Sequence, residues 1–241
     1  MTNSSEVSNA LSVTLSNSDL QGVCVAWADV LSDTLFEDGL AKEIPIIGTI
    51  YGLGRFGVSV RDRLFLKKLL CLLSEVADVP ATERAEIISK VDRSGEYRIK
   101  VGEKLLYILD KSEDHENAQV VAYLFRAFLS GELSYDDFLR ASRAIQSVMV
   151  ADLWRFVDDE TRQWDAYAVG YLLNSRLVDF DEQEVSVVDH DRGNWKDTKK
   201  YDITGAELTA SITELGEKVR RILRSRRAAA ESNASHVGRV N

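Results

Sequence analysis

The chain has 241 residues, of which 45% are hydrophobic and 29% are charged, which is the composition of an ordinary globular protein. Its net charge of −9 argues against a generic nucleic-acid binder, because such proteins carry a basic surface. The N-terminus, MTNSSEVSNALSVTLSNSD, lacks the basic region and the continuous apolar stretch of a secretory signal. We therefore expect a cytoplasmic protein that begins with a disordered leader over residues 1–17.

Helical patterns dominate residues 18–150, which we predict to form an all-α domain. Ser18 is expected to cap a helix that runs to about Asp38, since apolar residues follow it at a period near 3.6. The apolar run 64–76 is predicted to be the central core helix, because it is too hydrophobic for a one-sided surface helix. Further helices are expected to start at Pro80, Ser94, Ala118 and Ser134, and the last is expected to continue to Phe156.

The segment Ile44–Val60, IPIIGTIYGLGRFGVSV, is nearly unbroken in apolar character and rich in glycine. Each glycine inside a helix costs about 1 kcal/mol relative to alanine, so a close neighbour, a bend or a lipid phase must offset that cost. A GxxxG pattern within the segment allows two helix backbones to approach closely. We favour a helix or helical hairpin buried in the bundle; a membrane span and a segment that inserts into lipid only on a conformational change are the alternatives. The residues concerned are Gly48, Gly52, Gly54, Gly57 and Arg55.

The pattern changes beyond residue 160. Two stretches, LVDFDEQEVSVVDHD and KKYDITGAELTASI, alternate apolar with polar residues and predict the two strands of a hairpin. The polar stretch HDRGNWKDTK between them is expected to form its tip. A short helix over Asp165–Asn174 is predicted before the hairpin and an arginine-rich helix after it, and residues 227–241 are expected to form a flexible basic tail.

This order, with LLNSRLVDF before the hairpin and ITELGEKVRRIL after it, resembles a winged helix-turn-helix of the MarR-like and PadR-like kind. The resemblance covers roughly residues 140–226 and implies a winged-helix-like α+β domain over 151–226, after an N-terminal helical bundle. Winged helices bind either DNA or other proteins. In a DNA reader the helix Asp165–Asn174 would enter the major groove, but it carries no Lys or Arg. We therefore favour protein contact or dimerisation.

The N-terminal half, from IPIIG through SVRDRLFLKKLL to AFLSGELSYDDFLRAS, resembles helical bacterial proteins of undefined function. Comparably packed modules of the tellurite-resistance type occur in stress and phage-defence contexts. This resemblance implies a context only, because it assigns no functional residue.

Few residues qualify as a chemical site. Cys24 and Cys71 are isolated and read as reduced core thiols, with a disulfide as the alternative. His115 belongs to an acidic helix start rather than to a metal site, and His190 to a solvated hairpin tip. No spacing nominates a triad, a phosphate loop or a zinc site, so we predict no catalytic residue, no metal and no cofactor.

Partner contacts are the remaining candidates. Trp195 lies in a polar turn, where its ring is expected either to fold back over the hairpin or to stay exposed and anchor a partner. Arginines of the last helix can complement its own C-terminus, hold an acidic partner or an acidic patch of this chain, or contact phosphates. The candidates are Arg220, Arg221, Arg224 and Arg227.

The sequence thus favours a non-enzymatic interaction or regulatory protein with a protein partner, a second copy of the chain being one candidate. The alternatives are a conditional membrane-active effector that uses segment 44–60, and a DNA-binding transcription regulator.

Overall fold

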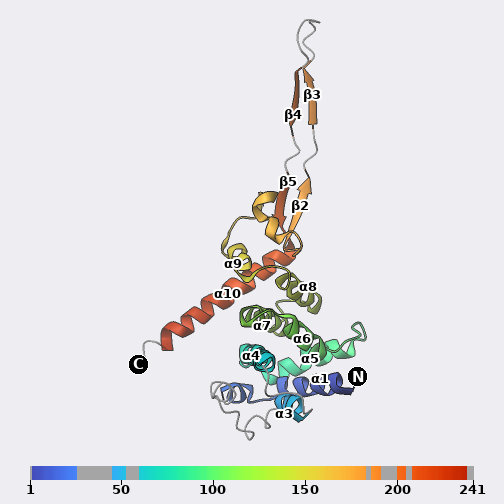
Figure 1. Ribbon diagram of the computed structural model, residues 1–241, viewed down its shortest axis with the longest axis vertical. Coiled ribbons are helices and arrows are strands. Elements are labelled where there is room, and N and C mark those ends of the chain that lie inside the picture. The colour runs from blue at the N-terminus through green and yellow to red at the C-terminus, as the bar shows by residue number, and fades with distance from the viewer. Residues whose placement is uncertain are drawn as a thin grey trace.

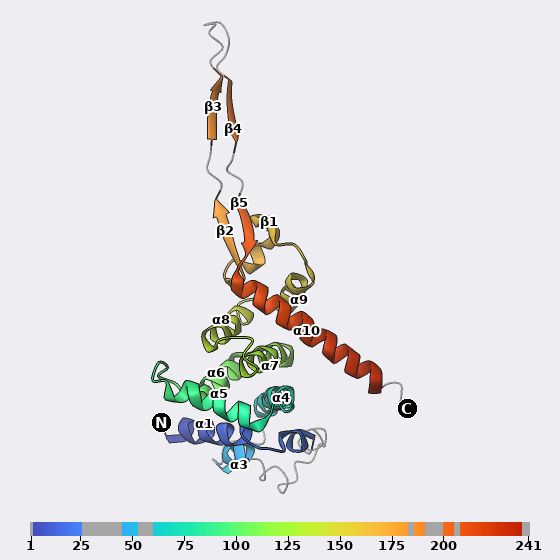
Figure 2. The ribbon, with the colours of Figure 1, turned by 180° about the vertical axis from the view of Figure 1, so that it is seen from behind.

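A computed structural model describes residues 2–25, 45–52, 60–182, 186–190, 200–204 and 208–237. The protein is mainly helical, with a small three-stranded antiparallel sheet near its C-terminal end (Figure 1). The helices stack into a layered body, and a β-hairpin extends away from it, as both views show (Figures 1 and 2).

The first helix corrects the expectation of a disordered leader. Residues Thr2–Leu15 form α1, in which Leu11 and Leu15 are fully buried. Val7, Ala10 and Leu11 give this helix a packed face despite its many Ser and Asn residues. Residues 20–25 are helical again, and the capping contact is made by Asp19 rather than Ser18: its Oδ1 accepts from Gly22 N at 3.1 Å. The rest of this helix lies outside the described residues.

The glycine-rich segment is described only in part. Pro45–Gly52 form α3, which packs on α1 at the edge of the body (Figure 1). Ile46 is fully buried, and its backbone N donates to Thr14 Oγ1 at 3.2 Å. Gly48 is half-buried, whereas Gly54, Arg55 and Gly57 lie outside the described residues. Burial of the whole segment therefore stays a prediction.

The centre of the body is not the helix that we expected. It is α7 (His115–Leu129), which buries most of its length, including Val121, Leu124 and Phe125. The expected central helix, α4 (Val60–Glu75), packs along α7 but leaves Leu64 53% exposed. Alanines at three positions of α7 let neighbouring helices approach it closely from several sides. These positions are Ala118, Ala122 and Ala127. The prediction for α4 rested on its many leucines, which show that a helix is hydrophobic but not that neighbours surround it.

A buried arginine joins the ends of two helices. Arg84 of α5 (Ala81–Arg93) is 1% exposed and faces the C-terminal ends of α1 and α4. Its guanidinium donates to the carbonyl oxygens of Leu15 and Asn17, both at 2.6 Å, and to three carbonyls that follow α4. These are Val76 at 3.1 Å, Ala77 at 3.3 Å, and Val79. A cation here opposes the negative ends of both helix dipoles and satisfies carbonyls that the helices leave unpaired.

Another predicted helix boundary is confirmed by the structure, and two are wrong. The Ser134 cap is confirmed, since its hydroxyl accepts from Asp137 N at 3.0 Å at the start of α8 (Tyr135–Ile145). The expected continuation to Phe156 is wrong, because a turn at 146–149 separates α8 from α9 (Val150–Asp158). A helix from Ser94 is also wrong: α6 spans Val101–Lys111. The residues before it form a loop in which Tyr97 donates to Asp136 Oδ1 at 2.9 Å.

The C-terminal part holds the sheets. Strands β1 (Gln163–Asp165), β2 (Val178–Glu182) and β5 (Leu208–Ile212) form one antiparallel sheet in the order β1-β5-β2. Strands β3 (Ser186–His190) and β4 (Lys200–Thr204) pair with each other as a second sheet. The last helix, α10 (Glu214–Val237), runs from the sheet across α9, α8 and α7, and its far end extends beyond the body (Figures 1 and 2).

Candidate interaction surface

The base of the hairpin is fixed by close packing. Thr213 Oγ1 donates to Arg176 O at 2.9 Å and accepts from Gly216 N at 3.0 Å, which caps α10. Gly216 lies so close to β2 that a Cβ added there would stand 2.1 Å from Leu177 O. Arg176 has a positive φ of 59°, an uncommon conformation for a residue other than glycine. These contacts set the direction in which the hairpin leaves the body.

Beyond this base the hairpin has little support. We use the name arm for residues 178–212. Its outer strands β3 and β4 lie beyond the helical body in both views (Figures 1 and 2). Their register runs from Ser186 opposite Thr204 to His190 opposite Lys200. A two-stranded ribbon has two open edges, and such a ribbon alone is marginally stable in water. Val187 is 57% exposed on this ribbon.

The arm is acidic. Residues 178–212 contain nine Asp and Glu but only four Lys and Arg. Two of the carboxylates, Asp179 and Asp181, lie exposed on β2, where Asp181 accepts from Ser211 at 3.0 Å. Trp195, the expected anchor, belongs to the arm but lies outside the described residues, so its role stays a prediction.

The expected recognition helix is short and of another type. Ala166–Leu172 form a 3-10 helix, η2, which buries Ala166, Val169 and Leu172. Tyr167 is 89% exposed, and Leu173, directly after η2, is 53% exposed. Residues 166–177 lie between β1 and β2, and η2 is interrupted at Val169, whose backbone is not helical (φ −117°, ψ 21°). The segment is therefore two short 3-10 turns separated by a kink, in place of the single α-helix expected over Asp165–Asn174.

The arginines of α10 are largely engaged within the chain. Arg220 is 7% exposed, stacks over the ring of Phe156 at 4.4 Å and donates to Thr161 O at 2.8 Å. Arg224 donates to Asp159 O at 3.1 Å, and Arg227 pairs with Asp158. Arg221 is exposed, and it makes no ion pair with the residues that the structure describes. Arg227 and Arg224, the latter also 3.8 Å from Glu160, thus lie against carboxylates at the end of α9, whereas Arg220 binds a backbone carbonyl.

Charged contacts also extend from α10 to the core. Arg226, another arginine of this helix, pairs with Glu75 of α4, a carboxylate whose side chain is 11% exposed. Burial raises the pKa of Glu75, while the guanidiniums of Arg226 and Arg126 act in the opposite direction. Lys218 pairs with Asp137 of α8 at 2.9 Å. Such partners are distant in sequence, so no local pattern could have signalled them.

A loop carboxylate links α9 to the sheet. Asp159 accepts from Thr161 N at 2.8 Å and from the Trp164 indole at 2.7 Å. The hydrogen bonds of Thr161 hold the pKa of Asp159 below its ordinary value, although partial burial acts against them.

A groove of about 790 Å³ lies between α4 and the start of α7. It contains Cys71, whose thiol donates to Gln119 Oε1 at 2.7 Å. Burial raises the pKa of Cys71 to about 12, so this thiol is protonated near neutral pH and is not an activated nucleophile. His115 and Asp114 line the groove, and Asp114 caps α7 by accepting from Asn117 N at 2.9 Å. His115 therefore stands in the first turn of a helix that an acidic residue caps, as the sequence predicted.

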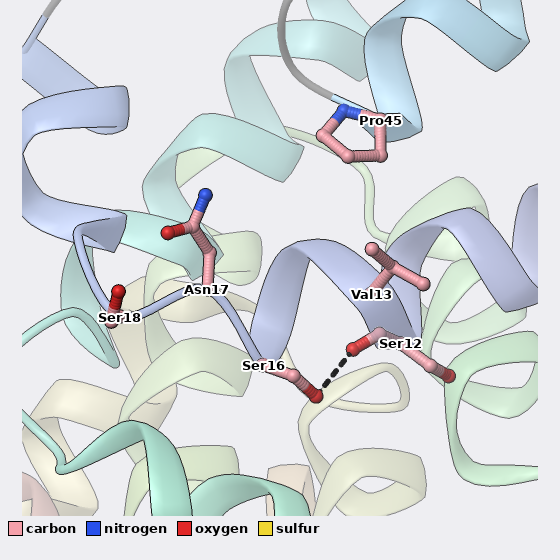
Figure 3. A pocket seen from close by; sticks show the side chains of 6 residues that line it. All are labelled: Ser12, Val13, Ser16, Asn17, Ser18 and Pro45. Carbon is pink, nitrogen blue, oxygen red and sulfur yellow. Dashed lines mark hydrogen bonds between the residues drawn. The ribbon is translucent and has the colours of Figure 1, made fainter.

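A second cleft, of about 570 Å³, lies between the end of α1 and the start of α3 (Figure 3). Val13 and Pro45 are its apolar lining residues, and its other side chains are polar and uncharged. The hydroxyl of Ser16 donates to Ser12 O at 2.9 Å, and Asn17 Oδ1 accepts from Asp19 N. Polar groups committed to the backbone in this way offer little for recognition of a charged ligand.

Both cysteines are free thiols, Cys24 being buried. In the described part of the chain, no group of three or more His, Cys, Asp and Glu is arranged to hold a metal ion. None of the helices described has the length and apolar character needed to cross a bilayer. Comparisons with protein families, with curated proteins and with solved structures returned no match to this chain.

Proposed function

We propose that the protein is a non-enzymatic interaction protein that docks onto a basic surface of a protein partner through its arm. The observation that carries this proposal is a two-stranded acidic ribbon that extends beyond the body, with Val187 exposed on it. The open edges of such a ribbon can pair with a strand of another chain. A surplus of carboxylates on residues 178–212 favours a basic partner and disfavours nucleic acid.

The stiff base of the arm supports the same proposal. A docking element gains affinity when it is held in its binding orientation before the partner arrives. Gly216 and Thr213 provide this by packing α10 directly against Arg176 and Leu177, in the connection between η2 and β2. We also propose that residues 151–226 form a winged-helix-like domain and that this domain contacts a protein partner.

A photo-crosslinking amino acid at Val187 tests the proposal. The expected result is a crosslink from this position to a basic protein of the host, and none from Glu86, an exposed position on α5. The purified partner should then lose most of its affinity when residues 183–207 are replaced by an Asn-Gly turn, which is suited to a two-residue hairpin. Binding should also weaken as salt rises. An unchanged affinity after this replacement, in a variant of unchanged helical content, would refute docking by the arm.

A further inference from the structure

The outer face of α6 carries a line of basic residues. Lys100, just before the helix, and Lys104, Tyr107 and Lys111 within it follow one another at spacings of three or four residues, which places them on one side. The opposite side is buried through Val101, Leu105, Ile108 and Leu109. Tyr107 is 55% exposed among the lysines, although aromatic rings are usually covered by a neighbour.

The same surface continues onto α4. Arg61, whose side chain is 84% exposed, reaches Asp110 of α6 at 3.6 Å, so the two helices lie side by side there. One turn further along α4, Leu64 is 53% exposed. Lys68 of α4 donates to Ser112 O and thereby ties α4 to the end of α6. We call the combined surface of Lys100, Lys104, Tyr107, Lys111, Arg61 and Leu64 the basic face.

The charge of this region differs in sign from that of the chain. Residues 98–111 contain four Lys and Arg and two carboxylates, and Arg61 adds a further cation, whereas the whole chain carries −9. Two more carboxylates, Glu113 and Asp114, border this region in the groove that Leu64 lines, so the local excess over these residues is one positive charge. The carboxylates Glu103 and Asp110 lie to one side of the line of lysines, and Asp110 is the partner of Arg61. Charges more than about 10 Å away are screened at 0.1 M salt, so a docking partner responds to the local excess.

We infer that the basic face binds the surface of an anionic phospholipid membrane. Lysines near such a surface are attracted by its negative potential, and tyrosine is favoured at the boundary between headgroups and acyl chains. Leu64 and Tyr107 supply apolar area that a purely ionic partner, such as nucleic acid or an acidic protein, would not require. This inference goes beyond docking by the arm and uses a different surface of the molecule.

Flotation with vesicles tests the inference on the full chain. Vesicles of equal parts phosphatidylcholine and phosphatidylglycerol should carry the protein, and vesicles of phosphatidylcholine alone should not. Changing Lys100, Lys104 and Lys111 together to glutamine should lower the partition coefficient about 100-fold. The matched control changes three exposed cations of α5 and α8 to glutamine and should leave binding within about twofold. These are Lys90, Arg140 and Arg143.

Tyr107→Ala separates lipid from other polyanions. It should lower binding to the anionic vesicles roughly fivefold, because the ring no longer enters the interface, and leave binding to heparin unchanged. Heparin and vesicle binding that depend equally on the lysines, with no effect of Tyr107→Ala, would overturn the lipid assignment in favour of a general polyanion site. No flotation, or flotation that survives the triple lysine change, would overturn the inference altogether. Neither result bears on crosslinking from Val187, so the two proposals fail independently.

Discussion

Arg84 is the buried cation on which the C-terminal ends of α1 and α4 converge, and its replacement by methionine tests this contact. Methionine has a similar length but donates no hydrogen bond. The change removes the guanidinium donor from five carbonyl oxygens, those of Leu15, Asn17, Val76, Ala77 and Val79. Of these, Val76 O keeps a second donor, Val79 N at 3.2 Å. A hydrogen bond to a charged group contributes about 1.5–3 kcal/mol, so full additivity over five bonds would give a loss comparable to the whole stability of a typical protein.

The expected loss is smaller because two of these acceptors, on Asn17 and Ala77, are only partly buried and regain water. We therefore expect Arg84→Met to lower the free energy of unfolding by about 4 kcal/mol, the range found when one partner of a buried charged contact is removed. In a chain of this length the thermal midpoint should fall by about 10 °C. Arg84→Lys, which keeps the charge but not the planar donors, should recover part of the loss.

Urea unfolding followed by circular dichroism measures the change. The control is Arg93→Met on the same helix, where the exposed side chain bonds to Ser89 nearby, and a cost under about 0.5 kcal/mol is expected. A cost for Arg84→Met no larger than that of the control would show that the five carbonyls do not depend on the guanidinium.

Three further predictions concern single residues. Gly216→Ala should cost about 3 kcal/mol in urea unfolding, because its Cβ would meet Leu177 O at 2.1 Å; a neutral result would mean that the base of the arm is not tightly packed. Because the pKa of Asp159 is lowered by folding, its ionised form stabilises the fold above its ordinary pKa, and that contribution is lost as the pH falls through the folded pKa. Trp164 fluorescence should report this loss below about pH 4, and Asp159→Asn should remove the change. Iodoacetamide should alkylate Cys71 about 1000-fold more slowly in the native protein than in urea at pH 8, since its pKa is raised from 9.0 to about 12; peptide mass spectrometry measures both rates.

Local signals were read from the sequence with success. The cap at Ser134 depends on a few adjacent residues and was found. The two predicted strand stretches, which hold β2 with β3 and β4 with β5, follow from alternating Val, Ile and Thr residues. The break between α8 and α9 was missed because residues 146–149 contain neither Gly nor Pro.

Contacts between distant segments were not predictable in the same way. Arg84 stands in ATERAEII, where it looks like one more charge on an exposed helix face, and only the approach of α1 and α4 makes it a core residue. The loop before α6 was taken for helix because nothing local shows that Tyr97 packs on Tyr135, with ring centroids 4.7 Å apart. The lysines of α6 were not predicted to form a site for a similar reason. Arg61 and Leu64 of α4 join them only in the folded chain.

The path of α10 has a mechanical consequence. One end of this helix is anchored beside β2 at Gly216, and further along its length it is tied to α8 through Lys218 and to α4 through Arg226. A load applied to the arm is therefore shared at once by helices from both halves of the sequence. Pulled from the tip of the arm, the two halves should rupture in a single force event rather than in two.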